Sequence, residues 1–289
     1  MRGAGTGVPR LLKFRASRLP VTPAAGKRTA MTPEFGRPAS ALVTGGAKRI
    51  GAALVRALAA DGWHVHVHHN ESAAEAEALV AEISAGGGSA SPVQADLADA
   101  EACRSLFARV APGNPPISLL VNNASLFRFD SQDDFTAEQW DLHEAVNLRA
   151  PALLTQQFAT RCEGRSGLVI NMLDAKIASP NPDYYSYTVS KLGLAGLTEL
   201  QARALAPNIR VNGIAPAVTM VSGPQSRENF DQAHVYNPLH RGVLVEHIVM
   251  TMKYLIKVPT ITGQVIVLDA GQRMLGMPRD VAFMVGTES

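Results

Sequence analysis

Short apolar runs alternate with longer amphipathic segments along most of the chain. From residue 40 onward the apolar runs predict seven strands, bounded by glycine or polar residues, at 41–43, 64–69, 91–95, 117–121, 168–172, 209–214 and 264–268. Helical periodicity occurs between them, at 49–61, from 72 to the glycines at 86–88, and at 98–110, 136–161, 184–205 and 244–256. Residues 216–243 are irregular, with room for one short helix.

This order of elements favours one architecture. Short apolar strands separated by helices imply right-handed crossovers and a parallel sheet covered on both faces. We therefore predict an α/β, single-domain Rossmann fold: a doubly wound, seven-stranded parallel sheet with helices on both faces. The domain is expected to span 40–275, followed by a C-terminal tail at 276–289. No internal repeat or second domain is evident.

The first 39 residues differ from the rest in composition. They hold eight Lys or Arg residues and one acid, Glu34, and lack helical or strand periodicity. We interpret residues 1–39 as a basic extension, disordered or upstream of a true start at Met31. A transit peptide for organellar import and an arm that binds nucleic acid or membrane remain alternatives.

Charge and cysteine content narrow the function classes. The remaining 250 residues carry 19 basic and 24 acidic side chains, a net charge of about −5, which argues against a nucleic-acid partner. No stretch approaches the roughly 20 apolar residues of a membrane span. Two cysteines, Cys103 and Cys162, cannot form a disulfide framework and fit a reducing compartment. We expect a cytoplasmic protein that acts on a small molecule.

A glycine-rich turn follows the first predicted strand. Gly45, Gly46 and Gly51 lie between that strand and the first helix, where backbone N–H groups and the helix N-terminus can hold a pyrophosphate. The spacing is looser than the usual G-x-G-x-x-G, and glycines at such a turn often serve only the turn. Lys48 and Arg49, expected to lie unpaired beside the phosphates, favour the nucleotide interpretation.

The end of the second strand bears on the choice of cofactor. An acid there would accept hydrogen bonds from a ribose 2′-hydroxyl and favour NAD, but the chain reads His68-His69-Asn70. Ser72 can donate to a 2′-phosphate and Arg49 can neutralise it, so NADP(H) is favoured over NAD, although Glu71 is discordant. The alternation of His64, His66 and His68 lacks a cysteine or acid at matching spacing, so we expect no metal.

Tyr187 and Lys191 carry the candidate chemistry. Four residues apart, they share one face of the predicted helix. A tyrosine with a pKa near 10 needs a neighbouring ammonium, with a cationic nicotinamide, to lower that pKa for acid–base work. The spacing arises often by chance, but its place after the fifth strand supports catalysis. Asp174, thirteen residues before Tyr187, stands where a serine is usual.

Over roughly residues 40–275 the chain resembles the short-chain dehydrogenase/reductase family. The resemblance rests on Thr44 to Gly51, Asp96, Asn122-Asn123-Ala124, Asn147 and the Tyr187/Lys191 pair. It implies catalytic roles for Asp174, Tyr187, Lys191 and Asn147, with Asn147 holding a water relay to Lys191. It implies NADP(H) binding by Gly45, Lys48, Arg49, Ile50, Gly51, His69, Asn70, Ser72, Asp96, Leu97, Asn123, Ala124, Ser125, Tyr187, Lys191, Pro216 and Val218. It also suggests a homotetramer.

Within that family the chain is similar to the pteridine reductases and the dihydromonapterin or dihydrofolate reductases. The shared features are Arg49 in the glycine loop, the run Asn123 to Phe127, and Asp174. By position, the resemblance implies pterin contacts from Arg49, Ser125, Phe127, Asp174 and Tyr187, with Phe127 stacking on the ring. Phe127 as a plain loop anchor and Asp174 as a plain loop cap are the structural alternatives.

The chemistry of an aspartate agrees with a nitrogen heterocycle. Reduction of a ketone builds negative charge on oxygen, which a carboxylate repels. Reduction of a ring C=N places charge on nitrogen, and a carboxylate can accept hydrogen bonds from ring N–H groups. We therefore predict NADPH-dependent reduction of a pterin. The rivals are a carbonyl or 3-oxoacyl-[acyl-carrier-protein] reductase, which Asp174 disfavours, and a nonenzymatic NADP-binding regulator, which the Tyr/Lys/Asn set disfavours.

Overall fold

The computed structural model describes residues 35, 39–110, 114–162 and 164–286. Seven parallel strands form one sheet in the order β3-β2-β1-β4-β5-β6-β7. The strands are β1 (Ser40–Val43), β2 (His64–His69), β3 (Ser89–Gln94), β4 (Ile117–Asn122), β5 (Gly167–Met172), β6 (Ile209–Pro216) and β7 (Val265–Leu268). The predicted fold class is thereby confirmed.

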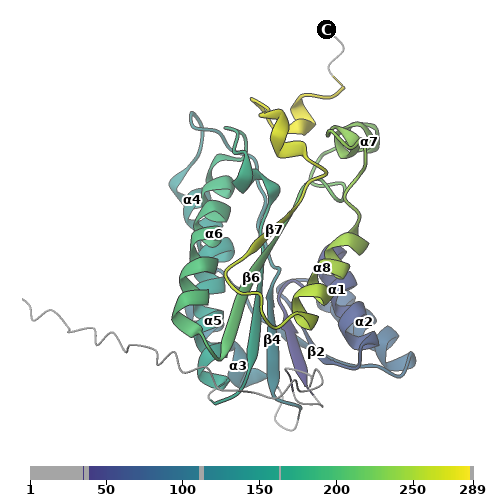
Figure 1. Ribbon diagram of the computed structural model, residues 1–289, viewed down its shortest axis with the longest axis vertical. Helices are drawn as coiled ribbons and strands as arrows, with labels where there is room; N and C mark the ends of the chain where they lie inside the picture. The colour runs from purple at the N-terminus through teal and green to yellow at the C-terminus, as the bar shows by residue number, and fades with distance from the viewer. Residues whose placement is uncertain (1–34, 36–38, 111–113, 163, 287–289) are drawn as a thin grey trace, which may run out of the picture. The chain divides into compact units, whose positions relative to one another are not determined.

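Helices cover both faces of the sheet (Figure 1). The helices are α1 (Arg49–Ala60), α2 (Ala73–Ala85), α3 (Ala100–Arg109), α4 (Ala137–Glu144), α5 (Ala150–Arg161), α6 (Tyr185–Leu205), α7 (Arg227–Val235) and α8 (Val245–Lys257). Helices α1, α2 and α8 lie on one side, and α3, α4, α5 and α6 on the other (Figure 1). Helix α7 is the short helix allowed for within the irregular stretch.

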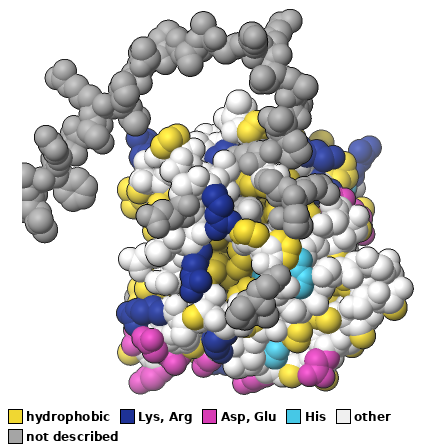
Figure 2. All heavy atoms as spheres, turned by 90° about the horizontal axis from the view of Figure 1, so that it is seen from below, with side chains coloured by type: hydrophobic (Ala, Val, Ile, Leu, Met, Phe, Trp, Pro, Cys, Tyr) yellow, Lys and Arg dark blue, Asp and Glu magenta, His cyan; other side chains and the backbone are white. Residues whose placement is uncertain are grey.

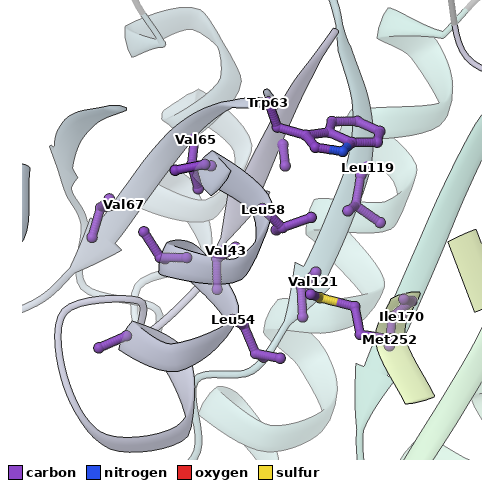
Figure 3. Close-up of a cluster of buried hydrophobic side chains, with 14 of the residues drawn as sticks. Val43, Leu54, Leu58, Trp63, Val65, Val67, Leu119, Val121, Ile170 and Met252 are labelled. Carbon is purple, nitrogen blue, oxygen red and sulfur yellow. The ribbon is translucent and has the colours of Figure 1, made fainter. Parts of the chain in front are cut away.

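Apolar side chains fill the space between the sheet and each helical layer. On one side Leu54 and Leu58 of α1 and Met252 of α8 pack on Val43 and Val121 of the central strands (Figure 3). On the other, α3, α5 and α6 form a second apolar layer. Burial of a leucine contributes roughly 2 kcal/mol, so these layers fix the strands that carry the site.

The long helix predicted over 136–161 is interrupted. A π-helical turn, η1 (Ala145–Arg149), separates α4 from α5. Pro151 explains the interruption, because a proline in a helix has no N–H to donate and its ring crowds the carbonyl of the residue four positions earlier, here Asn147. The wider turn relieves that contact and places Asn147 in an irregular backbone.

The domain is longer than predicted at both ends. Phe35, assigned from the sequence to the basic extension, is buried with its ring centroid 5.7 Å from that of Trp63. The rest of that extension, 1–34 and 36–38, lies outside the described residues. At the other end, short 3-10 helices at Gln272–Leu275 and Val281–Phe283 continue the structure, and Val281 is buried. The expected tail is therefore, as far as residue 286, part of the fold.

Two further observations concern surfaces. None of the helices in the described part of the chain has the length and apolar character needed to cross a membrane.

The face of the molecule that lies at the bottom of Figure 1 carries Lys and Arg side chains beside Asp and Glu side chains, with apolar side chains between them (Figure 2). Charges of both signs are thus mixed over the described residues visible on that face.

Candidate active site

A cavity of about 1540 Å³ opens at the carboxyl ends of the strands. Loops after β1 to β6 line it, which is where ligands bind in open α/β sheets. Of the sequence-predicted site residues, the cavity brings together Gly45, Lys48, Arg49, Ile50, Gly51, Asn70, Ser72, Asp96, Leu97, Asn123, Ala124, Ser125, Phe127, Asp174, Tyr187, Lys191, Pro216 and Val218. His69 and Asn147 are not among the lining residues.

The glycine loop is shaped by close backbone approaches. Gly45 has φ +58°, and a Cβ there would lie 3.0 Å from the Cα of Ala124. A Cβ on Gly51 would lie 2.1 Å from the Gly45 carbonyl oxygen. The Asn123 amide holds the loop by donating to the carbonyls of Thr44 and Gly45, at 2.9 and 3.1 Å. Asn123 therefore shapes the loop as well as lining the cavity.

The two cations of the loop have partners, contrary to our expectation. Lys48 forms a half-exposed ion pair with Glu75 at 2.8 Å. Arg49 has φ +54° and donates to the Val221 carbonyl at 2.7 Å. Arg49 thus reaches across the cavity mouth to the loop after β6.

His68, not His69, supports the nucleotide loop. Its Nδ1 accepts the Gly45 N–H at 3.0 Å and its Nε2 donates to the Ala95 carbonyl at 3.1 Å. Burial lowers the pKa of His68 to about 4, so the ring is neutral. His69 is not among the cavity-lining residues, and its Nδ1 lies 3.2 Å from the Asn70 carbonyl oxygen, so its role in cofactor binding stays a prediction. The alternation of side chains along a strand could have identified His68.

The remaining histidines of β2 bind serines. His64 contacts Ser89 and Ser91 at 2.7 and 3.1 Å, and His66 contacts Ser91 at 2.9 Å. Within the described ranges, no group of three or more His, Cys, Asp or Glu side chains is arranged to hold a metal ion.

Asp174 and Tyr187 are directly hydrogen-bonded. The Tyr187 hydroxyl donates to Oδ2 of Asp174 at 2.8 Å. The other oxygen, Oδ1, accepts the Lys176 N–H at 2.8 Å and caps the 3-10 helix Ala175–Ala178. The capping alternative and the partnership with Tyr187 are therefore both present. Capping fixes the carboxylate in the orientation that reaches the phenol.

Burial controls the ionisation of Tyr187 and Lys191. Burial, then the charge and hydrogen bond of Asp174, hold the pKa of Tyr187 well above its ordinary value. Burial lowers the pKa of Lys191 to about 8, although the Asp174 charge opposes that shift. The Lys191 ammonium donates to the Met172 carbonyl at 2.9 Å and lies 5.6 Å from the Tyr187 ring centroid. Burial and Asp174 thus keep Tyr187 protonated at neutral pH.

Asn147 has a saturated side chain. Its Oδ1 accepts from the Leu126 N–H at 2.8 Å and from the Ser125 hydroxyl at 3.3 Å. Its Nδ2 donates to the Leu126 carbonyl and the Ser190 hydroxyl, both at 3.0 Å. Asn147 therefore holds the loop after β4 against α6, and its side chain has no remaining capacity for a water relay.

Phe127 belongs to an aromatic cluster at the substrate end of the cavity. Its ring stacks on Tyr184 with centroids 4.1 Å apart and meets Tyr187 edge-on at 4.7 Å. Tyr184 has φ +55°, an uncommon conformation for a bulky residue, and its ring is nearly parallel to that of Phe283. Sequence reasoning missed Tyr184 and Phe283 as cavity residues.

The C-terminal segment supplies a further wall that sequence reasoning also missed. Asp280 pairs with Lys176 at 2.8 Å, and Arg279 pairs with Asp183 at 2.8 Å. Phe283 packs edge-on against another cavity residue, Phe129, at 5.6 Å. No local motif marks these residues, because their partners are about 100 to 150 positions earlier in the chain.

The model of the short chain dehydrogenase family matches residues 39–232. Among curated proteins, the 3-oxoacyl-[acyl-carrier-protein] reductase FabG of Staphylococcus aureus is 33% identical over 241 residues, covering 81% of this chain and 98% of that protein. The corresponding enzyme of Synechocystis is 33% identical over 239 residues, covering 81% and 96%.

Solved structures show the same fold. FolM alternative dihydrofolate reductase 1 from Brucella canis, complexed with NADP, is 41% identical, with a TM-score of 0.79, covering 82% of this chain and 94% of that one. A short chain dehydrogenase from Burkholderia cenocepacia in complex with NADP is 32% identical, with a TM-score of 0.74, covering 81% and 97%.

Proposed function

We propose that this chain, which belongs to the short chain dehydrogenase family, is an NADPH-dependent reductase of a pterin ring. The observation that carries the proposal is the hydrogen bond of 2.8 Å between Tyr187 and Asp174, beside the edge-on Phe127 ring in the same cavity. This combination offers a proton donor, a carboxylate and an aromatic surface to one flat, nitrogen-rich ring.

The cavity suits NADP(H) at the glycine loop. The backbone of Gly45 and Gly51 is packed so closely that a Cβ would clash, and the absence of side chains there lets a pyrophosphate approach the N-terminus of α1. The Gly45 N–H itself is donated to His68 and shapes the loop. Asn70, Glu71 and Ser72 line the cavity after β2. The last residue of β2 is His69 and not the acid that favours NAD, and Ser72 can donate to a 2′-phosphate, whereas Glu71 opposes one. Two similar structures, from Brucella canis and Burkholderia cenocepacia, are complexes with NADP. When bound, NADPH supplies the hydride.

Three side chains, Tyr187, Lys191 and Asp174, supply and replace the proton that the substrate ring takes up. Tyr187 is protonated at neutral pH, so it can donate to the ring nitrogen on which charge develops. The buried Lys191 ammonium stabilises the phenolate that remains. Asp174 orients the Tyr187 phenol and accepts a hydrogen bond from an N–H of the substrate ring. The Asp174 carboxylate also relays protons from solvent back to Tyr187.

The second candidate is reduction of a 3-oxoacyl chain on an acyl carrier protein. The curated relatives FabG at 33% identity favour it. The Asp174 carboxylate disfavours it, because an alkoxide developing beside Tyr187 would be repelled by a charge only one hydrogen bond away. The 41% identity to FolM points toward the pterin.

An NADPH oxidation assay separates the candidates. The purified full chain would be offered dihydrobiopterin, dihydromonapterin, dihydrofolate and a 3-ketoacyl substrate, each with NADPH or NADH. We expect turnover of at least one pterin compound with preference for NADPH. Turnover of the ketoacyl compound alone would overturn the proposal, and cofactor binding without any turnover would favour a regulator.

We further propose a homotetramer. Leu200 on α6 and Met250 on α8 are large apolar side chains that are 66% and 67% exposed. They lie on opposite faces of the sheet, so two separate faces are available for association. Sedimentation of the purified chain at about four times its mass of 30.7 kDa is the expected result.

A further inference from the structure

Three buried polar side chains beside the site have no role in the proposed reaction. They are Asp130, His143 and Ser186, which are 3%, 0% and 0% exposed. Asp130 belongs to the loop after β4, His143 to α4, and Ser186 to the start of α6. Polar groups this deeply buried are costly unless they are hydrogen-bonded.

Their hydrogen bonds form one connected network. The Ser186 hydroxyl donates to Oδ2 of Asp130, and the Ser186 N–H donates to Oδ1 at 3.1 Å. Because its proton is given to Asp130, the Ser186 oxygen accepts the Nδ1–H of His143 at 2.6 Å. The opposite nitrogen, Nε2, is then an acceptor, and it receives the Arg128 N–H at 3.3 Å.

Both ring nitrogens of His143 are therefore engaged, each with a different segment. Burial lowers the pKa of His143, with Arg128 and Lys191 acting in the same direction and Asp130 opposing, which agrees with a neutral ring. Unlike Leu142 before it on the same helix, His143 does not line the cavity. His143 therefore contacts the segments that line the cavity and not a molecule bound in it.

The two segments that His143 joins carry the two aromatic groups of the site. Arg128 directly follows Phe127, and Ser186 directly precedes Tyr187. The rings of Phe127 and Tyr187 meet edge-on at 4.7 Å, and the His143 ring lies 6.1 Å from that of Tyr187.

We infer that His143 is a positioning residue that sets the separation between the Phe127 ring and the Tyr187 hydroxyl. The role of Phe127 as the substrate platform rests on the proposed function. A substrate stacked on Phe127 must present its reacting nitrogen to Tyr187 within a few tenths of an ångström. The imidazole fixes that geometry because it hydrogen-bonds to the neighbours of both residues.

Three substitutions test the two hydrogen bonds of His143, one to Ser186 and one to Arg128. His143→Phe keeps a ring of similar size and removes both hydrogen bonds. His143→Gln can return an acceptor to the Nε2 position, and His143→Asn can return a polar group to the Nδ1 position. We expect His143→Phe to raise the pterin KM about tenfold, since the Arg128 N–H loses its partner and no longer fixes the segment that carries Phe127.

The pattern of rescue distinguishes positioning from stability. His143→Gln should restore the pterin KM more than His143→Asn does, because the Arg128 N–H fixes the Phe127 side of the site. The KM for NADPH should stay unchanged in all three. His66→Phe is the matched control, a buried histidine of β2 whose side chain contacts Ser91 and not the cavity.

Crystal structures of the full-length variants give a readout that is independent of the substrate. His143→Phe should move the Phe127 and Tyr187 rings from their 4.7 Å separation, and His143→Gln should return them toward it. An unchanged separation in His143→Phe would overturn the inference, as would losses of activity that follow the melting temperature equally in all variants. If the wild type reduces no pterin, the proposed function fails, and the ring separation still decides the role of His143.

Discussion

The ammonium group of Lys176 lies 2.8 Å from the carboxylate of Asp280, 104 residues further along the chain. Their side chains are only 9% and 17% exposed. Lys176 lies in the 3-10 helix that Asp174 caps, and Asp280 caps the 3-10 helix at Val281–Phe283. The ion pair therefore ties the C-terminal segment to the loop that presents Asp174 to Tyr187.

Asp280→Asn should destabilise the fold substantially. The neutral amide leaves the Lys176 ammonium mostly buried without its charged partner, which costs about 3 kcal/mol of the free energy of unfolding. Urea denaturation at pH 7 measures this loss in the free energy of unfolding. Asp231→Asn is the control, because the Arg227–Asp231 pair is exposed and should change stability by less than about 1 kcal/mol. Equal losses in the two variants would contradict the expectation.

Asp174→Ser should reduce pterin turnover more than cofactor binding. The serine hydroxyl can still contact Tyr187 but cannot accept ring N–H hydrogen bonds as a charged group. We expect kcat/KM for the pterin to fall at least about 100-fold, in the range that a positioned acid–base group contributes. Steady-state kinetics and NADPH titration measure the two effects separately. If pterin reduction persists undiminished, our account of Asp174 is wrong.

Phe127→Leu should weaken binding of the pterin. Loss of the aromatic face removes a stacking contribution of about 1 kcal/mol, which corresponds to an increase in KM of about fivefold or more. Phe135→Leu is a matched control, because both phenylalanines are 38% exposed but Phe135 packs on Trp140 outside the cavity. Similar increases in KM for the two variants would argue that Phe127 is only a loop anchor.

The pH dependence of turnover should follow Lys191. Its pKa of about 8 means that the ammonium is present below that pH and is lost as the pH rises through it. The phenolate left by Tyr187 then lacks its stabilising charge, so kcat/KM should fall above about pH 8. Rates measured from pH 6 to 10 test this. A profile that stays flat to pH 10 would exclude this role for Lys191.

The parts of the site that the sequence predicted lie close to strand ends. The carboxyl ends of parallel strands meet at one edge, so Gly45, Asn123 and Asp174 could be placed together from local motifs alone. The sequence did not identify His68, whose ring accepts the Gly45 N–H, because which face of a strand meets the cavity depends on register. Asp280 and Phe283 could not be found, since their contacts join segments about 100 residues apart and no periodicity records them.

Local sequence motifs also could not predict the ionisation of the site residues. The Tyr187/Lys191 spacing indicated proximity, but the pKa of each group depends on burial, which the four-residue spacing does not contain. The π-helical turn around Asn147 was likewise hidden, although Pro151 in a helical pattern marked the place where regular geometry had to change.

Acid should destabilise the protein through the histidines of β2. Burial lowers the pKa values of His66 and His68 from 6.5 to about 4, so between these values the unfolded chain binds protons that the folded chain does not. Stability is therefore fully present above about pH 6.5 and is lost as the pH falls through about 4, by roughly 2 to 3 kcal/mol for each histidine.

His66→Phe should remove one of these two contributions. The Nε2 of His66 is buried and has no hydrogen-bond partner among the described residues, so an apolar ring is tolerated there, whereas His68 must stay to hold the Gly45 N–H. Urea denaturation of both proteins at pH 7 and pH 5 measures the effect. The variant should lose less stability between these pH values than the wild type. An identical loss in the two proteins would mean that His66 is not responsible for the acid sensitivity.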